Sequence, residues 1–573
     1  MEKIKKLRNL LKKYNLDGYI IPKNNEFFGE YVQSNEDNLK YISNFTGSAG
    51  FAIILKKKNY IFVDGRYTIQ AGIQCGKSFE VCTIPQVMPN QVFKNLKIKI
   101  GFDPKKHTEI SLKRYFSSFY KNLIPMNENL IDLIWKRKKI TSNKPFYLLD
   151  KKVVGESEKN KIYKVKKIIK SNNIDYLFTT SSENIAWLLN IRGQDTDYSP
   201  IPNSHAIIGS NNKVKVFCAL KKINKNLKDK LRSNVEFCDF NLLPKHISSI
   251  ANKKILIDSN TCSFFYKFLF EKDNIVINKQ DPITYLKSLK NKIEIQNSIK
   301  SHVLDGSALT KFIFWLKENV NQKQISEISA QEKLLKFRKK NKDFKFLSFP
   351  TISGAGPNSA IIHYKANKKS NRALNKGDVY LVDSGGQYSY GTTDVTRTIS
   401  LDVKNPKIKD IYTRVLKGHI AVAQHKLNHK VNGDIIDKAA RKYLKQINLD
   451  YPHGTGHGVG YFLNVHEGPQ AISKGNKIQF QEGMITSNEP GYYKKNEFGI
   501  RIENLVYVKK ENKKLKFKDL TLAPIDKDLV NKKLLNEKEK RWLNSYHQNV
   551  YYNLKKYMNK KQLTQLKEAC SNI

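Results

Sequence analysis

From residue 377 to residue 397 the chain reads Gly377-Asp-Val-Tyr-Leu-Val-Asp383-Ser-Gly-Gly-Gln-Tyr-Ser-Tyr-Gly-Thr-Thr-Asp394-Val-Thr-Arg397, which places two aspartates eleven residues apart. Asp383 ends an apolar run of the β type, Asp394 opens a β-branched run, and glycines stand between them. This pattern predicts a hairpin that brings the two carboxylates together at its end. Like charges held close need a cation or a shared proton to compensate them.

Three further segments supply side chains that bind metal ions: His453-Gly-Thr-Gly-His457-Gly-Val-Gly with Val465-His466-Glu467 after it, Ser487-Asn-Glu489-Pro-Gly, and Gly499-Ile-Arg501-Ile-Glu503-Asn. Their glycines let backbone and imidazole approach a shared centre. The alternation in the last segment puts Arg501 and Glu503 on one face of a strand.

Together with the two aspartates, these segments provide four carboxylates and one imidazole: Asp383, Asp394, His457, Glu489 and Glu503. Taken singly, an aspartate at a strand end is more often a cap, and a histidine flanked by glycines is more often structural. The joint pattern is more specific. Its oxygen-rich ligands suit Mn²⁺, Co²⁺ or Zn²⁺. Two divalent ions, about 3.5–4 Å apart and bridged by carboxylates, would balance the charge of all four carboxylates.

Length and composition predict a globular protein of three or four domains, with 573 residues of which 40% are hydrophobic. The net charge of +50 comes from lysines spread along the whole chain, without a nucleic-acid recognition motif. The six cysteines form no Cys-x-x-Cys pair, which is typical of reduced thiols. No apolar run approaches the roughly 18–20 residues of a membrane span. These features favour a cytoplasmic protein that binds neither nucleic acid nor membrane.

The N-terminal half contains an internal repeat. Asn38-Leu-Lys-Tyr-Ile-Ser-Asn-Phe-Thr-Gly47 aligns without gaps with Asn184-Ile-Ala-Trp-Leu-Leu-Asn-Ile-Arg-Gly193, and an amphipathic helix followed by a short strand precedes both copies. The repeat predicts two related α/β domains in tandem, with a boundary near Pro145. Coincidence in a biased composition is the alternative.

A third domain is predicted to open with a long helix that begins at Lys292 and to run to about Lys509, with helices over 408–426 and 433–446. The last helical region is rich in aromatic residues: Trp542, Tyr546, Tyr551, Tyr552 and Tyr557. Such a stripe is typical of a core or of a subunit interface. The predicted domains are therefore 1–145, 146–288, 289–510 and 511–573, the last as a dimer contact.

With these residues in this order, the chain resembles the pita-bread metallopeptidases. Asp64-Gly-Arg-Tyr67 and the tail Leu520-Thr-Leu…Trp542-Leu-Asn-Ser-Tyr-His resemble one branch of that family, the long three-domain cytosolic aminopeptidase P. The resemblance covers essentially the whole chain and is looser between 210 and 280. It implies two α/β domains before a pita-bread catalytic domain. It also implies hydrolysis of the bond between an N-terminal residue and a following proline.

The resemblance further implies roles for single residues. Asp383 would bind one ion, Asp394 and Glu503 would bridge two ions, and His457 and Glu489 would bind the other. A metal-bridging water would be the nucleophile, and Glu489 would take its proton. The implied substrate residues are His363, His466 and, on the proline side, His453; Arg501 would orient Glu503. Tyr492 and Tyr493 are further candidates for the substrate pocket.

The resemblance implies two divalent ions, in the first place Mn²⁺ with Co²⁺ or Zn²⁺ as alternatives, and a homodimer acting on peptides with proline second. Two alternatives stay open. One is a prolidase-type dipeptidase, which the duplicated N-terminal domains and the long tail disfavour. The other is a non-catalytic pita-bread binding module, although members of that kind lose the metal ligands, and all five positions are filled here.

Overall fold

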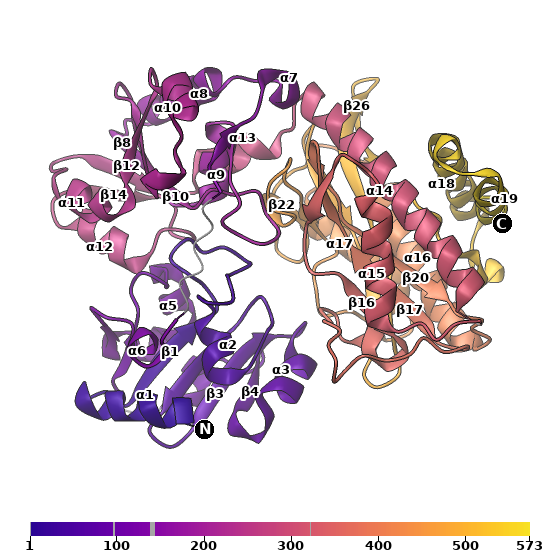
Figure 1. The fold of residues 1–573 in the computed structure, drawn as a ribbon, viewed down its shortest axis with the longest axis horizontal. Coiled ribbons are helices and arrows are strands. Elements are labelled where there is room, and N and C mark those ends of the chain that lie inside the picture. Colours follow the sequence, from indigo (N-terminus) through magenta and orange to yellow (C-terminus); the bar gives the residue numbers. More distant parts are fainter. Residues whose placement is uncertain (1, 95–97, 138–143, 321) are drawn as a thin grey trace. The chain divides into compact units, whose positions relative to one another are not determined.

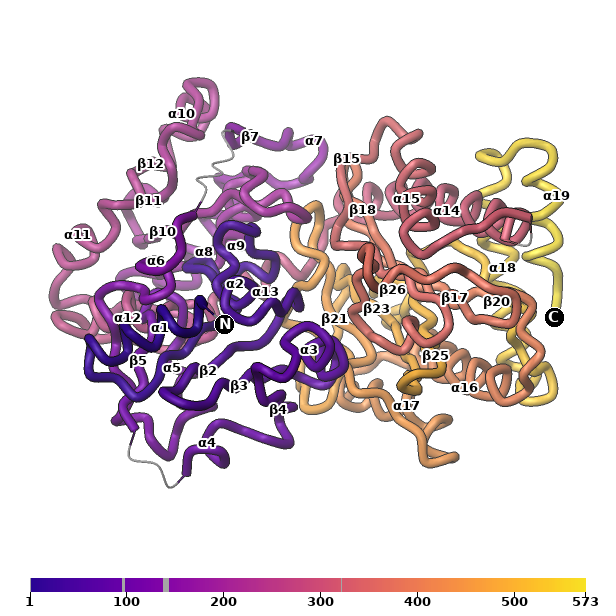
Figure 2. Tube along the Cα trace, turned by 60° about the horizontal axis from the view of Figure 1, so that its bottom comes forward, coloured from indigo at the N-terminus to yellow at the C-terminus, as the bar shows by residue number. Residues whose placement is uncertain are grey.

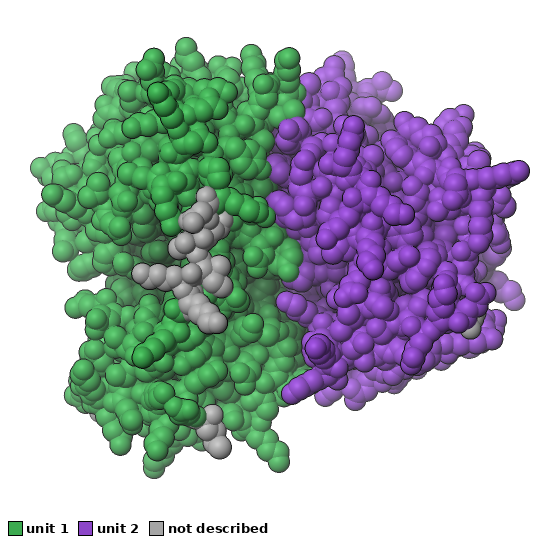
Figure 3. All heavy atoms as spheres, viewed as in Figure 1, with its two compact units in different colours: residues 1–284 green, residues 285–573 purple. Residues whose placement is uncertain are grey.

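The computed structural model describes residues 2–94, 98–137, 144–320 and 322–573. The chain divides into two compact units, Met1–Thr284 and Tyr285–Ile573, which Figure 3 shows in different colours. The predicted domain limits at 145/146, 288/289 and 510/511 stay predictions. No helix in the described part of the chain has the length and apolar character needed to cross a membrane.

The first unit contains two six-stranded sheets with the same topology (Figure 1). The first sheet has the order β4-β3-β2-β1-β5-β6, with β1 at Gly18–Pro22, β2 at Phe51–Leu55, β3 at Asn59–Asp64, β4 at Glu80–Ile84, β5 at Ile100–Phe102 and β6 at Leu123–Pro125. The second has the order β12-β11-β10-β8-β13-β14, with β8 at Tyr176–Thr179, β10 at Ser204–Gly209, β11 at Val214–Cys218, β12 at Val235–Asp239, β13 at Lys254–Ile257 and β14 at Ile275–Asn278.

Strand directions also agree between the two sheets. In each, the first strand in sequence pairs antiparallel with the second and parallel with the fifth, and the two outer pairs are parallel. Helices α1 (Glu2–Lys13) and α8 (Glu158–Ser171) precede the sheets. The predicted pair of related α/β domains is therefore confirmed.

The structure explains why the repeat keeps an asparagine at its seventh position. Asn44 and Asn190 follow the short helices α2 (Asn38–Ser43) and α9 (Ser182–Leu188), and their φ angles are 65° and 55°. Asparagine adopts this left-handed conformation more readily than most other residues with a side chain. The two asparagines therefore end equivalent helices in the same way.

The second unit encloses strands between two pairs of helices. In Figure 2, α14 (Lys292–Asn319) and α15 (Glu327–Lys339) lie on one side of the strands, and α16 (Pro406–Ala423) and α17 (Gly433–Lys445) on the other. The largest hydrophobic core contains residues of α14, α15 and α16 packed on β17 (Val379–Ser384) and β20 (Val395–Ser400). The helices predicted over 408–426 and 433–446, and the long helix from Lys292, are confirmed.

The predicted hairpin is confirmed as the antiparallel pair β17 and β20, in which Asp383 faces Thr396 across the ladder. Its connection is more ordered than a glycine turn. It contains β18 (Gly386–Tyr388) and β19 (Gly391–Thr392), which pair with each other, and β18 also pairs with β15 (Phe344–Leu347). Gly385 allows a close approach, since an added Cβ would lie 1.9 Å from the carbonyl oxygen of Thr393.

The remaining strands of the second unit form a five-stranded sheet of order β22-β21-β23-β26-β27 and smaller pairings. These strands are β16 (Ile352–Ala355), β21 (Gly456–Gly458), β22 (Glu467–Ile472), β23 (Ile485–Asn488), β24 (Gly491–Lys494), β25 (Phe498–Arg501), β26 (Asn504–Glu511) and β27 (Lys514–Asp519). The chain ends in α18 (Glu537–Leu554) and α19 (Lys560–Ala569), which both contact α14. Tyr546 of α18 lies in the core, whereas Tyr552 is 70% exposed.

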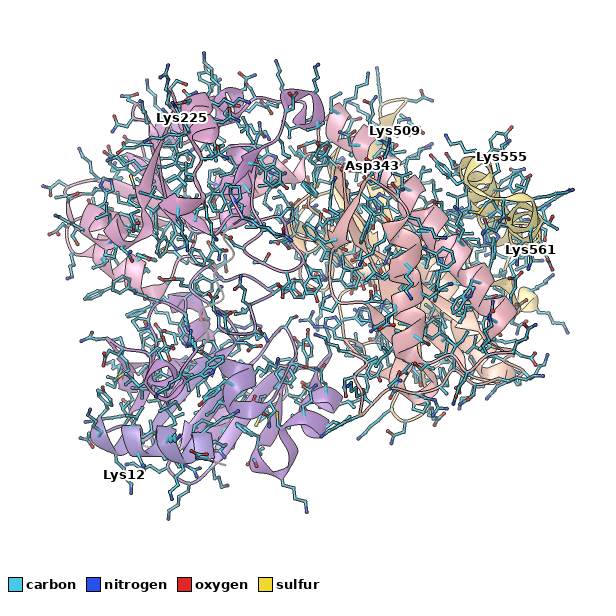
Figure 4. All side chains as sticks on the ribbon, viewed as in Figure 1. Lys12, Lys225, Asp343, Lys509, Lys555 and Lys561 are labelled. Carbon is cyan, nitrogen blue, oxygen red and sulfur yellow. The ribbon has the colours of Figure 1, made fainter. Side chains whose placement is uncertain are left out.

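The positive charge is distributed over both units. Lys12 and Lys225 in the first unit, and Lys509, Lys555 and Lys561 in the second, extend from separate elements (Figure 4), and all five are exposed. This distribution agrees with the interpretation of the charge as a general compositional bias.

Candidate metal centre

The five predicted ligands lie at or just beyond the ends of strands in the second unit. Asp383 is near the end of β17, Asp394 stands one residue before β20, and His457 is in the middle of β21. Glu489 follows β23, and Glu503 occupies the short connection between β25 and β26. The hairpin and two other sheets of the unit therefore deliver all five side chains.

Distances show the convergence of these side chains. His457 Nε2 lies 3.6 Å from Asp394 Oδ2 and 3.5 Å from Glu489 Oε1. Ligand atoms of Asp394, His457 and Glu503 all lie within 4.8 Å of one another. Asp383 belongs to the same group, because its charge acts on the titration of Asp394, Glu489 and Glu503.

Arg501 connects two of the carboxylates. Its Nη2 donates to Asp383 Oδ2 at 2.5 Å, and its Nε donates to Thr396 Oγ1 at 3.1 Å. The Thr396 hydroxyl in turn donates to Glu503 Oε2 at 2.8 Å. Arg501 and Glu503 therefore both bond Thr396, although they do not share a strand as predicted: Arg501 ends β25 and Glu503 lies in the connection after it. A hydrogen-bonded guanidinium fixes the orientation of the carboxylate it holds.

The electrostatics of the site call for positive charge. Burial raises the pKa of Asp394 and of Glu503 well above the usual carboxyl range, and neighbouring carboxylates raise both further. Burial also raises the pKa of Glu489, partly offset by His457. Among the described residues, Asp383 Oδ1 is buried without a hydrogen-bond partner. A divalent cation would bind this oxygen, and its charge would offset the free-energy cost of ionising the neighbouring carboxylates.

The imidazole of His457 is also oriented to bind a cation. His457 Nδ1 lies 2.9 Å from the carbonyl oxygen of Gly458, which accepts only if Nδ1 carries the proton. Nε2 then faces Asp394 and Glu489, and in the neutral imidazole it would offer its lone pair to a cation between them. The donor set therefore fits a divalent metal site.

The other predicted histidines have different surroundings. The His466 ring lies 4.4 Å from the His457 ring, and its charge acts on Glu489. His453 Nε2 lies 2.9 Å from the Tyr493 hydroxyl, which accepts from Arg501 Nη1 at 2.6 Å. A hydrogen-bonded chain thus links His453 to Asp383 through Tyr493 and Arg501.

His363 is half-buried in the loop after η5 (Gly356–Ala360). That element packs on β25, where the Gly499 amide donates to Ser359 Oγ at 2.7 Å. An added Cβ at Gly499 would lie 2.0 Å from the Ser359 carbonyl oxygen. The loop of His363 is therefore tied to the strand that carries Arg501, while the role of His363 stays a prediction.

Sequence reasoning did not identify Thr396 or Ser487. Ser487 Oγ accepts from the His457 amide at 2.9 Å and donates to Glu489 Oε1 at 3.1 Å, so it links two ligands. Thr396 stands two residues after Asp394, but alternation alone does not show that its hydroxyl reaches Glu503. Of the two candidate pocket tyrosines, Tyr493 bonds Arg501 and His453, and Tyr492 packs against Phe498.

The closeness of the carboxylates predicts the pH dependence of metal-free protein. Because the folded pKa of Asp394, Glu489 and Glu503 is raised, the folded state binds more protons than the unfolded chain above about pH 4. Their contribution to stability is therefore present at low pH and is lost as pH rises through the folded pKa values. Thermal unfolding should be measured between pH 5 and pH 8 for chelated protein and for protein with saturating Mn²⁺. The Tm of the chelated protein should fall, relative to that of the Mn²⁺-bound protein, as the pH rises. Parallel curves with and without the ion would contradict the prediction.

Gly456 provides a test of the packing. An added Cβ would lie 2.0 Å from the carbonyl oxygen of Ser487, so Gly456→Ala must push β21 from β23 and separate His457 from Glu489. We expect a loss of about 1–3 kcal/mol in the free energy of unfolding, as for other overpacked sites, together with weaker metal binding. Urea unfolding measures the free energy of unfolding, and calorimetry measures metal binding. Gly72→Ala is the control, since an added Cβ there meets no atom within 4 Å. Unchanged metal binding in Gly456→Ala would contradict the prediction.

Comparisons with known proteins agree with the fold and the site. Residues 297–510 match the model of metallopeptidase family M24, and residues 513–573 match its C-terminal region. Residues 3–133 and 136–294 each match a creatinase/prolidase N-terminal domain. The chain is 38% identical to a probable Xaa-Pro aminopeptidase P of Coprinopsis cinerea, over 95% of this chain and 93% of that protein. It is 34% identical to Xaa-Pro aminopeptidase 1 of Dictyostelium discoideum, over 96% and 92%.

Among solved structures, the X-prolyl aminopeptidase of Caenorhabditis elegans superposes with a TM-score of 0.94 at 30% identity, over 100% of this chain and 99% of that one. That protein is described as a cytosolic enzyme with a di-nuclear active site. The prolidase of Pyrococcus horikoshii superposes over 64% of this chain, with a TM-score of 0.52 at 23% identity, which shows a shared fold alone.

Fold and site thus define a metallopeptidase with a pita-bread catalytic domain preceded by two creatinase-type N-terminal domains. The identities with the two aminopeptidases extend over nearly the full length of this chain and of each relative, so the chain can be assigned to one branch of this class. The chain belongs to the Xaa-Pro aminopeptidase P branch of metallopeptidase family M24. The predicted fold class, the resemblance and the assignment as an enzyme are confirmed.

Proposed function

We propose that this chain removes the N-terminal residue from peptides whose second residue is proline, using two divalent metal ions held by Asp383, Asp394, His457, Glu489 and Glu503. The observation that carries the proposal is the meeting of buried Asp383, Asp394 and Glu503 and half-buried Glu489 with one oriented imidazole. When bound, two such ions act as Lewis acids and lower the pKa of an attacking water. Asp383 would bind one ion, Asp394 and Glu503 both, and His457 and Glu489 the other.

Charge supports two ions over one. When all are ionised, the four carboxylates and the Arg501 guanidinium carry a net charge of three negative. One divalent ion leaves the buried site negative, and two leave a single positive charge that one small anion neutralises. Since uncompensated buried charge is costly, the pair is the better match.

The side chains around the ligands would handle protons and substrate. Glu489 would bind one ion and take up the proton of the attacking water, the role that the resemblance to the family implies. His466 lies against His457 and would stabilise the developing oxyanion or give a proton to the leaving nitrogen. His363 and His453 would contact the substrate, the latter on the proline side. Arg501 would act indirectly by orienting Asp383 and, through Thr396, Glu503.

The bond before a proline is a tertiary amide without an N–H, so the substrate pocket must accept a ring and need not accept a hydrogen bond. The test is cleavage of Arg-Pro-Pro, Arg-Ala-Ala and Gly-Pro before and after chelation, with re-addition of Mn²⁺. We expect metal-dependent release of Arg from the first peptide alone. Preference for Gly-Pro would favour the prolidase-type alternative, and no cleavage of any peptide would refute the proposal.

The proposal includes Mn²⁺ as the physiological ion, with Co²⁺ or Zn²⁺ as alternatives, because the donors are mostly oxygen atoms. It also includes a cytosolic location, which is described for the C. elegans relative. A homodimer is the third part, and exposed Tyr552 on α18 supplies apolar surface for it. Metal analysis of the purified protein and its sedimentation velocity test the first and third parts.

A further inference from the structure

A buried arginine next to the candidate ligand Glu503 donates hydrogen bonds to backbone carbonyl groups from separate parts of the chain. Arg397 is 1% exposed, and its Nη1 donates to the carbonyl oxygen of Glu503 at 2.6 Å. Its Nε donates to the Pro524 carbonyl at 3.0 Å, and its Nη2 to the Ala523 carbonyl at 2.8 Å. Glu503 stands between two strands, so its carbonyl depends on this bond rather than on a sheet ladder.

The C-terminal helix α18 completes this network. The Tyr546 hydroxyl, on a side chain buried in the core, lies 2.9 Å from Arg397 Nη2 and 2.9 Å from the Ala523 carbonyl oxygen. It accepts from the guanidinium and donates to the carbonyl. Tyr546 therefore helps to hold the guanidinium that bonds the backbone of Glu503, together with Asn504 Oδ1, which also accepts from Nη2 at 2.9 Å.

The same helix supports a second ligand through Trp542. The Trp542 ring stacks on Tyr546, with centroids 5.4 Å apart, and meets the edge of the His419 ring at 5.8 Å. His419, fully buried in α16, donates from Nδ1 to the Asn488 carbonyl at 3.1 Å, and Asn488 Nδ2 donates to the His419 carbonyl at 2.9 Å. Asn488 is the residue before Glu489, so this reciprocal pair fixes the backbone that presents Glu489.

We propose that Tyr546 and Trp542 are positioning residues of the metal centre, which hold Glu503 and Glu489 through Arg397 and His419. The C-terminal segment then helps to set the geometry of the metal centre in its own chain, in addition to any contact that it makes in a dimer. Helix α18 contacts α14 and α16 (Figure 1), and its residues Tyr546 and Trp542 reach Arg397 and His419. The inference rests on the proposed metal site.

The test compares Tyr546→Phe with Tyr552→Phe in the full chain. The first removes one buried hydroxyl, and the second removes an exposed one from the same helix. Binding of Mn²⁺ to metal-free protein is measured by calorimetry, at a temperature where unfolding curves show both variants folded. We expect Tyr546→Phe to bind Mn²⁺ about tenfold more weakly, within the range for residues that orient metal ligands. Its kcat should fall while KM stays within about twofold, and Tyr552→Phe should match the wild type.

The outcomes separate this inference from the proposed function. Wild-type protein that binds no Mn²⁺ would remove the metal site itself and the inference with it. Wild-type protein that binds Mn²⁺, next to a folded Tyr546→Phe with equal affinity and equal kcat, would overturn the inference alone, even if its Tm were lower. If Tyr546→Phe does not fold, Trp542→Phe takes its place with the same expected and overturning results, because it keeps the Tyr546 hydroxyl and weakens the ring contacts to His419 and Tyr546.

Discussion

Asp394→Asn should lower kcat/KM for Arg-Pro-Pro by at least about a thousandfold, which corresponds to about 4 kcal/mol of lost transition-state stabilisation. The substitution keeps the shape of the side chain and removes one of the four negative charges. Asp394 is 4% exposed and lies among His457, Glu489 and Glu503, in the position proposed to bridge both ions. Its loss should weaken both binding sites, so the metal content after dialysis should fall below one ion per chain.

The same variant should be more stable than the wild type when both are metal-free. Burial and the charges of Asp383 and Glu489 disfavour ionised Asp394, so a neutral amide removes a destabilising term from the folded state. With saturating Mn²⁺ the order should reverse, because only the wild type gains the full free energy of ion binding. Thermal unfolding of both proteins with and without Mn²⁺ measures this crossover. Asp229→Asn, at an exposed position of α10 (Lys225–Leu231) in the first unit, is the control and should change neither quantity. A variant with near wild-type kcat/KM would contradict the bridging role.

The convergence of the five candidate ligands could be predicted because each stands in a short segment whose glycines and alternation carry local information. The hairpin around Asp383 and Asp394 follows from period two, and the repeat at Asn38 and Asn184 from direct alignment. In both cases the feature that matters lies within about twenty neighbouring residues.

The supporting contacts could not be predicted in this way. Thr396 and Glu503 are 107 positions apart, and Arg397 reaches Tyr546 across 149 positions. No periodicity relates such residues, since only the folded chain brings them together. The aromatic stripe of α18 shows the limit, because its pattern does not distinguish buried Tyr546 from exposed Tyr552.

Glu467 forms a second acidic centre that sequence reasoning noted only as a neighbour of His466. Its carboxylate is fully buried between two lysines, with Lys287 Nζ at 3.2 Å from Oε2 and Lys290 Nζ in a shorter contact with Oε1. Both lysine side chains are at most 1% exposed. Removing the charge of a buried partner leaves the remaining charges uncompensated, which costs about 3–5 kcal/mol. That is a large part of the roughly 5–15 kcal/mol by which a typical domain is stable.

Glu467→Gln is therefore expected to lower the free energy of unfolding by about 3–5 kcal/mol, measured by urea unfolding of metal-free protein so that ion binding does not contribute. Replacing the whole group by apolar residues should cost far less, because charges that are absent need no compensation. The triple variant Lys287→Met, Lys290→Met, Glu467→Leu should thus regain most of the stability that the single substitution loses. If the triple variant were as unstable as Glu467→Gln, the loss would come from packing at this position and not from unpaired charge. A single variant with wild-type stability would show that water or another acidic group compensates the two lysines.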